Sequence, residues 1–233
     1  MMTMNNPLSL DDQVILRDYL SGFVTPRRFE LFRQVASNRT RYVSMVLENI
    51  YQSHNASAVM RSCDCFGVQD IHIIEDENAY EVNPEIALGS SQWLTLYRYL
   101  NPQTATADCI QGLKNQGYRI VATTPRQSAQ SMEDFDVNAG KFALVFGTEK
   151  DGLSEAAFDM ADELIRIPMY GFTESFNISV SAALCLFHFT SDIRKKEVEW
   201  KLTENEIIEL ELNWLRTSIK GSALIEAEFL RNR

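Results

Sequence analysis

The chain has 233 residues, of which 45% are hydrophobic and 23% charged, a balance typical of one globular domain with terminal extensions. A net charge of −10 argues against a general nucleic-acid binder, and the apolar runs are too short to span a bilayer. The first six residues lack the basic and apolar regions of an export signal, so we expect a cytoplasmic location.

The N-terminal part is the most basic part of this acidic chain. Residues 1–41 contain six Arg and four acidic residues, whereas residues 42–191 contain 8 basic and 19 acidic residues. Two short helices are expected here, at 9–21 and 26–37, the second with Pro26 in its first turn. Arginines on such helices are usually a solvated face, although Arg binds phosphate well because its guanidinium can form two parallel hydrogen bonds.

Strands and helices alternate along the rest of the chain. Strands are predicted at 42–47, 68–74, 118–123, 142–146 and 163–167, and helices at 55–66, 105–116, 154–160 and 177–195. Thr203 and Glu206 form a capping box that begins a last helix, with a possible break at Gly221. This alternation predicts an α/β protein with a mostly parallel sheet, whose ligands bind beyond the carboxyl ends of the strands.

The first segment of chemical interest follows the strand at 42–47. Asn55 is predicted to cap the next helix, and Arg61 lies six residues further on. The simpler interpretation is a capped helix with one surface arginine.

The second segment begins where the buried strand at 142–146 ends. Gly147 is followed by Glu149, and Asp151-Gly152 precedes a helix. A plain strand–turn–helix connection would have this pattern too. The segment lacks the Gly-Lys-Ser/Thr of a phosphate loop, and the chain has no G-x-G-x-x-G.

The third segment, at 166–181, passes from a strand through Pro168 and Gly171 into a helix near Ser175 and Asn177. Loops of this kind present backbone groups to a ligand, although Asn177 could simply cap the helix while the small residues allow close packing.

Together the three segments offer one cation, one carboxylate, two amides and one hydroxyl: Arg61, Glu149, Asn55, Asn177 and Ser175. None of the four cysteines or three histidines has the spacing of a metal site or of a nucleophile with its base, so no metal is expected and the cysteines are interpreted as free thiols. Such a set suits a reaction whose difficult chemistry belongs to a cofactor.

The three segments resemble the motifs of SpoU-type RNA 2′-O-ribose methyltransferases of the SPOUT superfamily. The first motif, N-x-x-A-x-x-R followed by a small hydrophobic stretch and Gly, is matched by Asn55, by Val59 with the neighbouring Ala58, by Arg61 and by Gly67. F-G-x-E-x-x-G-L-S is matched by residues 146–154, and I-P-M-x-G-x-x-x-S-L-N-V-S-V-A by residues 167–181. The third match departs from the motif at Phe176, Ile178 and Ser181. Within the family, the sequence looks most like the tRNA guanosine-18 2′-O-methyltransferases.

The resemblance implies a deep trefoil knot and three regions. These are an arginine-bearing, RNA-contacting helical extension at 1–41, the knotted methyltransferase domain at 42–195 and a C-terminal helical extension at 196–233. It also implies S-adenosyl-L-methionine as cofactor and a homodimer. The cofactor would lie near Thr123, Gly147, Ile167, Met169 and Phe176. Part of the dimer interface would come from Leu184, Leu186, Phe187 and Phe189, although these residues could instead belong to the core of the monomer.

Roles for the site residues also follow from the resemblance. Arg61 would stabilise the alkoxide that develops on the ribose 2′-oxygen, because arginine is almost always protonated. Asn55 would orient Arg61 or the ribose, Glu149 would hold Asn55 or Arg61, and Ser175 and Asn177 would shape the catalytic loop. The arginines expected to contact RNA are Arg27, Arg28, Arg33, Arg39 and Arg41.

Three other functions fit parts of the sequence. A ribosomal RNA 2′-O-methyltransferase would carry the same motifs, although the short N-terminal helices favour tRNA. An RNA-binding protein that has kept the fold without turnover is disfavoured by the retained Arg61, Glu149, Ser175 and Asn177. An unrelated α/β nucleotide binder is disfavoured because no phosphate loop is present.

Overall fold

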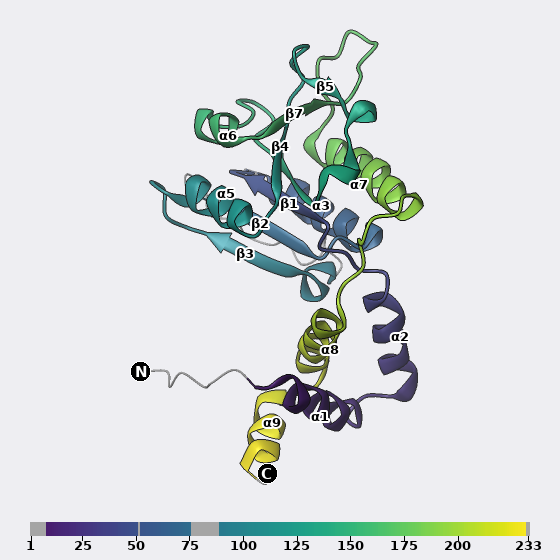
Figure 1. Cartoon of the computed structure of the whole chain (residues 1–233). Helices are drawn as coiled ribbons and strands as arrows, with labels where there is room; N and C mark the ends of the chain where they lie inside the picture. Colours follow the sequence, from purple (N-terminus) through teal and green to yellow (C-terminus); the bar gives the residue numbers. More distant parts are fainter. Residues whose placement is uncertain (1–7, 51, 76–88, 232–233) are drawn as a thin grey trace. The chain divides into compact units, whose positions relative to one another are not determined.

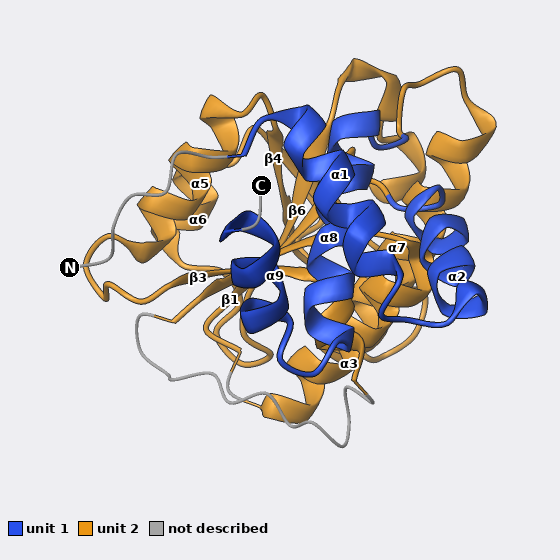
Figure 2. Ribbon diagram, turned by 90° about the horizontal axis from the view of Figure 1, so that it is seen from below, with its two compact units in different colours: residues 1–39, 201–233 blue, residues 40–200 orange. Residues whose placement is uncertain are grey.

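The computed structural model describes residues 8–50, 52–75 and 89–231 (Figure 1), so the first six residues, inspected above for an export signal, lie outside it. Two compact units are present: residues 40–200 form one, and residues 1–39 with 201–233 form the other (Figure 2). The two terminal segments thus share a unit. None of the helices in the described ranges is long and apolar enough to cross a membrane.

Unit 2, residues 40–200, is built on a seven-stranded sheet in which every strand pair is parallel, as the sequence predicts. The strands are β1 (Val43–Glu48), β2 (Asp70–Ile74), β3 (Thr95–Tyr99), β4 (Arg119–Thr123), β5 (Gln130–Ser131), β6 (Phe142–Phe146) and β7 (Glu163–Arg166). Their order in the sheet is β3-β2-β1-β6-β4-β7-β5. The strands followed by the three segments of interest, β1, β6 and β7, therefore lie near one another, with only β4 between β6 and β7.

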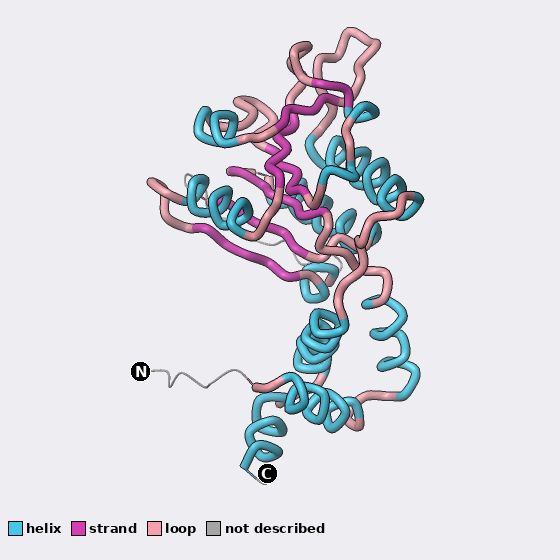
Figure 3. The backbone as a smooth tube through the Cα atoms, in the orientation of Figure 1, coloured by secondary structure: helices cyan, strands magenta, loops and turns pink. Residues whose placement is uncertain are grey.

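Helices cover both faces of this sheet (Figure 3), and α3 (Ser53–Phe66) packs with α7 (Ile178–Lys195) on one of them. The other face is covered by α5 (Ala105–Asn115) and α6 (Glu155–Met160). The side chains of β6 alternate between the hydrophobic cores on the two faces of the sheet: Leu144 lies in one core and Val145 in the other. This explains why the strand is apolar throughout. Short 3₁₀ helices complete the unit: η1 (Ser90–Trp93), η2 (Met132–Asp134) and η3 (Val137–Ala139).

Unit 1 consists of helices from the two ends of the chain, namely α1 (Leu10–Ser21), α2 (Pro26–Ala36), α8 (Glu204–Ser218) and α9 (Ser222–Arg231). The predicted capping box at Thr203 is present, and the predicted break separates α8 from α9 at Gly221, whose φ is +77°. Arg17 lies 3.3 Å from the buried Glu211. Burial raises the pKa of the Glu211 carboxyl, and the charge of Arg17 opposes that rise.

The five arginines expected to contact RNA occupy different environments. Arg27, Arg28 and Arg33 on α2 are exposed. Arg39 is only 1% exposed, and its guanidinium lies 5.6 Å from the ring centre of Trp214. Arg41 is half-buried and lies 3.2 Å from Asp70. Burial makes structural roles the better assignment for Arg39 and Arg41, so we keep the proposal of RNA contact for the three α2 residues only.

Candidate active site

The loop after β6 is closed on itself and projects Glu149. Thr148 and Gly152 exchange backbone hydrogen bonds of 2.9 and 3.1 Å across it. Gly147 permits this closure, because a Cβ at that position would lie 2.1 Å from the carbonyl oxygen of Gly152. Gly152 itself has φ +76°, which favours glycine. The two glycines thus fix the conformation that carries Glu149 away from the strand end.

One carboxylate oxygen joins the three segments singled out in the sequence. The side-chain amides of Asn55 and Asn177 both donate to Oε1 of Glu149, at 2.8 and 2.6 Å. The amide of Asn177 also lies 3.2 Å from Oδ1 of Asn55, and that of Asn55 donates to Gln52 at 3.0 Å. We call Asn55, Glu149 and Asn177 the amide–carboxylate cluster. It fixes the relative positions of α3, the loop after β6 and the start of α7.

The prediction that Asn55 caps α3 was wrong. The helix begins at Ser53, and Gln52 occupies the cap position without a side-chain capping bond. Asn55 is the third helical residue and is buried, and its amide is bonded to Glu149 instead of the helix backbone. The sequence pattern could not separate these two uses of an asparagine, because the Glu149 partner lies 94 positions away.

Asn177 has both of the roles that the sequence allowed, as a helix cap and as a residue of the site. It is the N-cap of α7, where its Oδ1 accepts from the backbone N–H of Ser179 at 2.9 Å and from the hydroxyl of Ser179 at 2.6 Å. Its amide group, on the other side of the same side chain, belongs to the amide–carboxylate cluster. One residue therefore starts the helix and holds Glu149.

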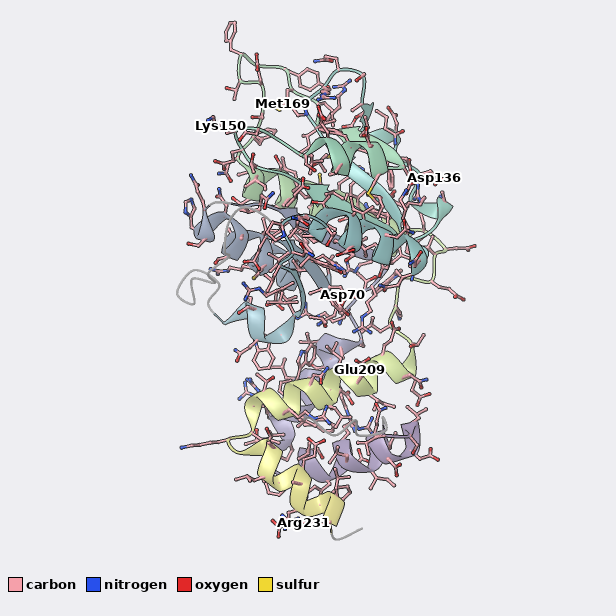
Figure 4. All side chains as sticks on the ribbon, turned by 90° about the vertical axis from the view of Figure 1, so that its left-hand side faces the viewer. Asp70, Asp136, Lys150, Met169, Glu209 and Arg231 are labelled. Carbon is pink, nitrogen blue, oxygen red and sulfur yellow. The ribbon has the colours of Figure 1, made fainter. Side chains whose placement is uncertain are left out.

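The five predicted cofactor residues line one cavity of about 390 Å³ in unit 2: Thr123, Gly147, Ile167, Met169 and Phe176. Glu149 and Ser175 line it as well. In Figure 4, Met169 and Lys150 of this lining lie close together at one end of the unit. The wall combines apolar side chains with the backbone of irregular loops, which suits a flat, mostly apolar ligand that needs hydrogen bonds at its edge.

A second hollow of about 380 Å³ adjoins the cavity. Its lining includes Gln52, Asn55 and Ile50, and it shares residues 148–151 and Ile178 with the larger cavity. Glu149 therefore stands between two spaces, one next to the predicted cofactor residues and one next to Asn55. This arrangement could hold two reactants on either side of one fixed carboxylate.

Arg61 is separate from both spaces. Its side chain is exposed on α3, it lines neither the cavity nor the second hollow, and it has no hydrogen bond or ion pair to any residue that the structure describes. The structure thus brings together four of the five predicted catalytic residues, Asn55, Glu149, Ser175 and Asn177, and leaves Arg61 apart.

Two other residues near the site were not predicted to contribute. Glu48 is buried at the end of β1 and accepts from the hydroxyl of Thr106 and from the N–H and hydroxyl of Ser154, all within 2.9 Å. It thereby ties the start of α6 to β1. Cys185 lines the cavity, and burial raises the pKa of its thiol to about 12. Cys185 is therefore a neutral wall residue and not a nucleophile.

Residues 42–187 match the SpoU rRNA Methylase family. A tRNA (guanosine(18)-2'-O)-methyltransferase of Borreliella burgdorferi is 40% identical over 218 residues, covering 93% of this chain and 98% of that protein. The A. aeolicus TrmH/SpoU tRNA modifying enzyme has a similar structure, with a TM-score of 0.74 and 28% identity, over 83% of this chain and 98% of that one. The structure of the SpoU methyltransferase AviRb of Streptomyces viridochromogenes, in complex with the cofactor AdoMet, shares the fold (TM-score 0.59, 20% identity, 70% and 65% coverage). The family match includes all three segments of the site.

Proposed function

The chain belongs to the SpoU rRNA methylase family, and from this premise we propose that it methylates the ribose 2′-hydroxyl of guanosine 18 in tRNA with S-adenosyl-L-methionine. The observation that carries the proposal is the amide–carboxylate cluster, which joins the three family motifs beside a cavity of suitable size. The choice of tRNA rests on the relative that matches nearly the whole chain. A cytoplasmic location follows from that substrate.

The cavity fits the cofactor in its chemistry. Phe176 and Ile167 offer flat apolar surface for an adenine, and the backbone groups after β6 and β7 offer hydrogen bonds to its edge. Phe176 stands where the family motif has leucine, so we expect a wider apolar contact there. When bound, S-adenosyl-L-methionine supplies an electrophilic methyl group and leaves as a neutral thioether.

The protein's own contribution is to position the ribose and stabilise charge. Asn55 faces the second hollow and is fixed by Glu149, so it can hold a ribose against the shared wall at residues 148–151. The 2′-hydroxyl must then lie roughly 3–3.5 Å from the atom it attacks. Negative charge develops on its oxygen as its proton passes to water, and the guanidinium of Arg61 is the charge we assign to stabilise it.

Arg61 can do this if a second copy of the chain completes the site. It lies on α3, which packs against α7, and α7 exposes Phe187 (61%) beside Phe66 of α3. Homodimerisation through these helices would cover Phe187 and carry Arg61 of one copy to the hollow of the other. Leu186 and Phe189, also expected at this interface, are buried in the core of unit 2, so that part of the prediction was wrong.

The family's trefoil knot is part of the proposal. It rests on membership of the family, and the sheet order is compatible with it, because β6 lies between β1 and β4, which both precede it in the chain. RNA contact by Arg27, Arg28 and Arg33 is proposed because these side chains are exposed on one short helix.

The decisive experiment is methyl transfer from labelled S-adenosyl-L-methionine to unmodified tRNA transcripts, followed by nuclease mapping of the 2′-O-methyl group. Label should appear at guanosine 18. Arg61→Ala should reduce kcat by roughly 10²–10³-fold, the usual effect of removing one stabilising group from a developing oxyanion. Its folding should be unchanged, because Arg61 bonds to none of the described residues. Arg61→Lys, which keeps the charge but loses the planar fork, should be intermediate.

Other results of the methyl-transfer experiment would change the proposed function. Cofactor binding without label on tRNA would make ribosomal RNA the substrate to test, and no cofactor binding would favour the non-catalytic RNA-binding protein. The dimer is tested separately by sedimentation of Phe187→Glu, which should be monomeric and inactive yet still bind the cofactor. A dimeric Phe187→Glu would contradict the proposed interface.

A further inference from the structure

Two aromatic side chains near the site are almost wholly exposed to solvent. Tyr170 and Phe172 are 96% and 109% exposed, on either side of Gly171 in the loop that joins β7 to α7. This loop lies at the top of the view in Figure 1. The two rings gain no burial energy in this chain, and they are the most exposed of its large hydrophobic side chains in the described ranges, which makes them candidates for contact with a ligand or partner.

The position of the two rings limits the kinds of ligand that could contact them. Met169, immediately before them, and residues 174–176, after them, line the cavity, whereas Tyr170 and Phe172 do not. Asn177, next along the chain, belongs to the amide–carboxylate cluster. The rings therefore stand outside the cofactor space but only a few residues from the place where the ribose must be held.

The net charge of unit 2 also limits how this unit can bind RNA. Residues 40–200 contain 12 Lys and Arg against 22 Asp and Glu, a formal net charge of −10, which is the whole net charge of the chain. Phosphate attraction is weak on such a unit. Stacking of bases on aromatic rings needs no positive charge, and it is the usual way in which proteins hold unpaired RNA bases.

We infer that Tyr170 and Phe172 form a stacking platform for unpaired nucleobases next to the ribose that is methylated. This inference rests on the proposed function, since it assigns a further RNA-positioning site to the same reaction. The platform binds bases through their flat faces, so it selects RNA whose target region is unpaired or can be unstacked. It contributes to RNA affinity independently of salt, in contrast to contacts made by arginines with phosphates.

The test compares variants that separate an aromatic ring from apolar bulk. Tyr170→Leu with Phe172→Leu keeps apolar side chains but removes both rings, whereas Tyr170→Phe keeps the ring and removes only the hydroxyl. The double variant should raise the Kd for tRNA transcript on the order of tenfold or more, by the same factor at about 50 and about 200 mM salt. Tyr170→Phe should match the wild type, and cofactor affinity should be unchanged in both, because neither ring lines the cavity.

The outcomes distinguish this inference from its premise. If the wild type methylates tRNA and the double variant binds tRNA as tightly, the stacking platform is wrong while the function stands. If the double variant loses tRNA affinity only because it sediments as a monomer, the rings belong to a protein interface and the inference is also wrong. A wild type that binds cofactor but methylates no tRNA would contradict the proposed function itself.

Discussion

At the scale of single residues, the site depends on side chains that use both of their polar ends. Asn177 accepts a backbone hydrogen bond at the start of α7 through Oδ1 and donates to Glu149 through its amide. Serine would retain the first contact and lose the second, because its hydroxyl cannot serve both positions. The stability and the activity that depend on Asn177 can therefore be separated by choice of substitution.

We predict that Asn177→Ala and Asn177→Ser both lose most methyl-transfer activity, because Glu149 loses one of its two amide donors. The alanine variant should lose about 1 kcal/mol more than the serine variant in the free energy of unfolding, since Ser is as good a cap as Asn and both variants lose the bond to Glu149. Urea unfolding and initial rates measure the two effects. Full activity in Asn177→Ser would show that the cap alone matters.

His72 gives a prediction about pH. It is buried between β1 and β3, its Nδ1 lies 3.0 Å from the Tyr99 hydroxyl, and burial lowers its pKa from 6.5 to about 4. Between these values the unfolded chain binds a proton that the folded chain does not. The free energy of unfolding contributed by neutral His72 is therefore complete above pH 6.5 and falls by about 3 kcal/mol as the pH drops to about 4.

Carboxylates also titrate in this range, so the measurement is a difference between two proteins. His72→Gln keeps a polar side chain opposite Tyr99 without a titrating group. The stability of the wild type should fall more steeply than that of this variant between pH 6.5 and 4 in urea unfolding. Parallel curves would mean that the pKa of His72 is the same in the folded and the unfolded chain, and would contradict the prediction.

At the scale of elements, the loop after β6 is the segment in which we expect a substitution to be tolerated least. Gly147→Ala would bring a Cβ to 2.1 Å from a backbone oxygen, which no rotamer change can relieve. We expect a loss of at least about 3 kcal/mol in the free energy of unfolding, together with loss of cofactor binding. Gly171→Ala is the matched control: the nearest atom to its Cβ would be 4.0 Å away, so its thermal unfolding should be close to wild type.

Elements with strong hydrophobic periodicity or clear capping residues were predicted from the sequence. Features that depend on contacts with distant parts of the chain were missed. Helix boundaries marked by Ser9, Ser154 and Thr203 agree with the structure because each cap acts locally. The strands β3 and β5 were not predicted; β3 has a half-exposed, aromatic-rich pattern at the sheet edge, and β5 is two residues long. Asn55 was placed at a cap because its long-range partner is invisible in the local pattern.

The motifs themselves were found in the sequence, and the family resemblance that they carry named five residues that do line the cavity. Exposure was harder to predict. Arg27 lies on α2, whereas Arg39 and Arg41 follow that helix, and nothing in the local sequence shows that the latter two guanidinium groups are buried or half-buried. The same limit applied to Leu186 and Phe187, which are neighbours in one apolar helix but lie on its buried and exposed sides.

At the scale of the whole molecule, charge is divided between the two units. Unit 1 contains ten Lys and Arg and ten Asp and Glu, whereas unit 2 accounts for the entire net charge of −10. A polyanion therefore meets less repulsion at unit 1, and the exposed Arg27, Arg28 and Arg33 are the cations that α2 offers it. RNA affinity should accordingly contain a part that depends on salt and comes from α2.

Arg27→Ala with Arg28→Ala should weaken tRNA binding and flatten the dependence of log K on log salt by roughly one unit for each phosphate that the variant no longer neutralises. Lys220→Ala with Arg231→Ala is the control, because it removes the same charge from the same unit outside α2. If α2 binds the phosphates, only the variant that lacks Arg27 and Arg28 changes the slope of log K against log salt. A change in net charge elsewhere alters the affinity but not the number of counterions released at the interface. Equal slopes in both double variants would place the phosphate-binding residues elsewhere on the chain.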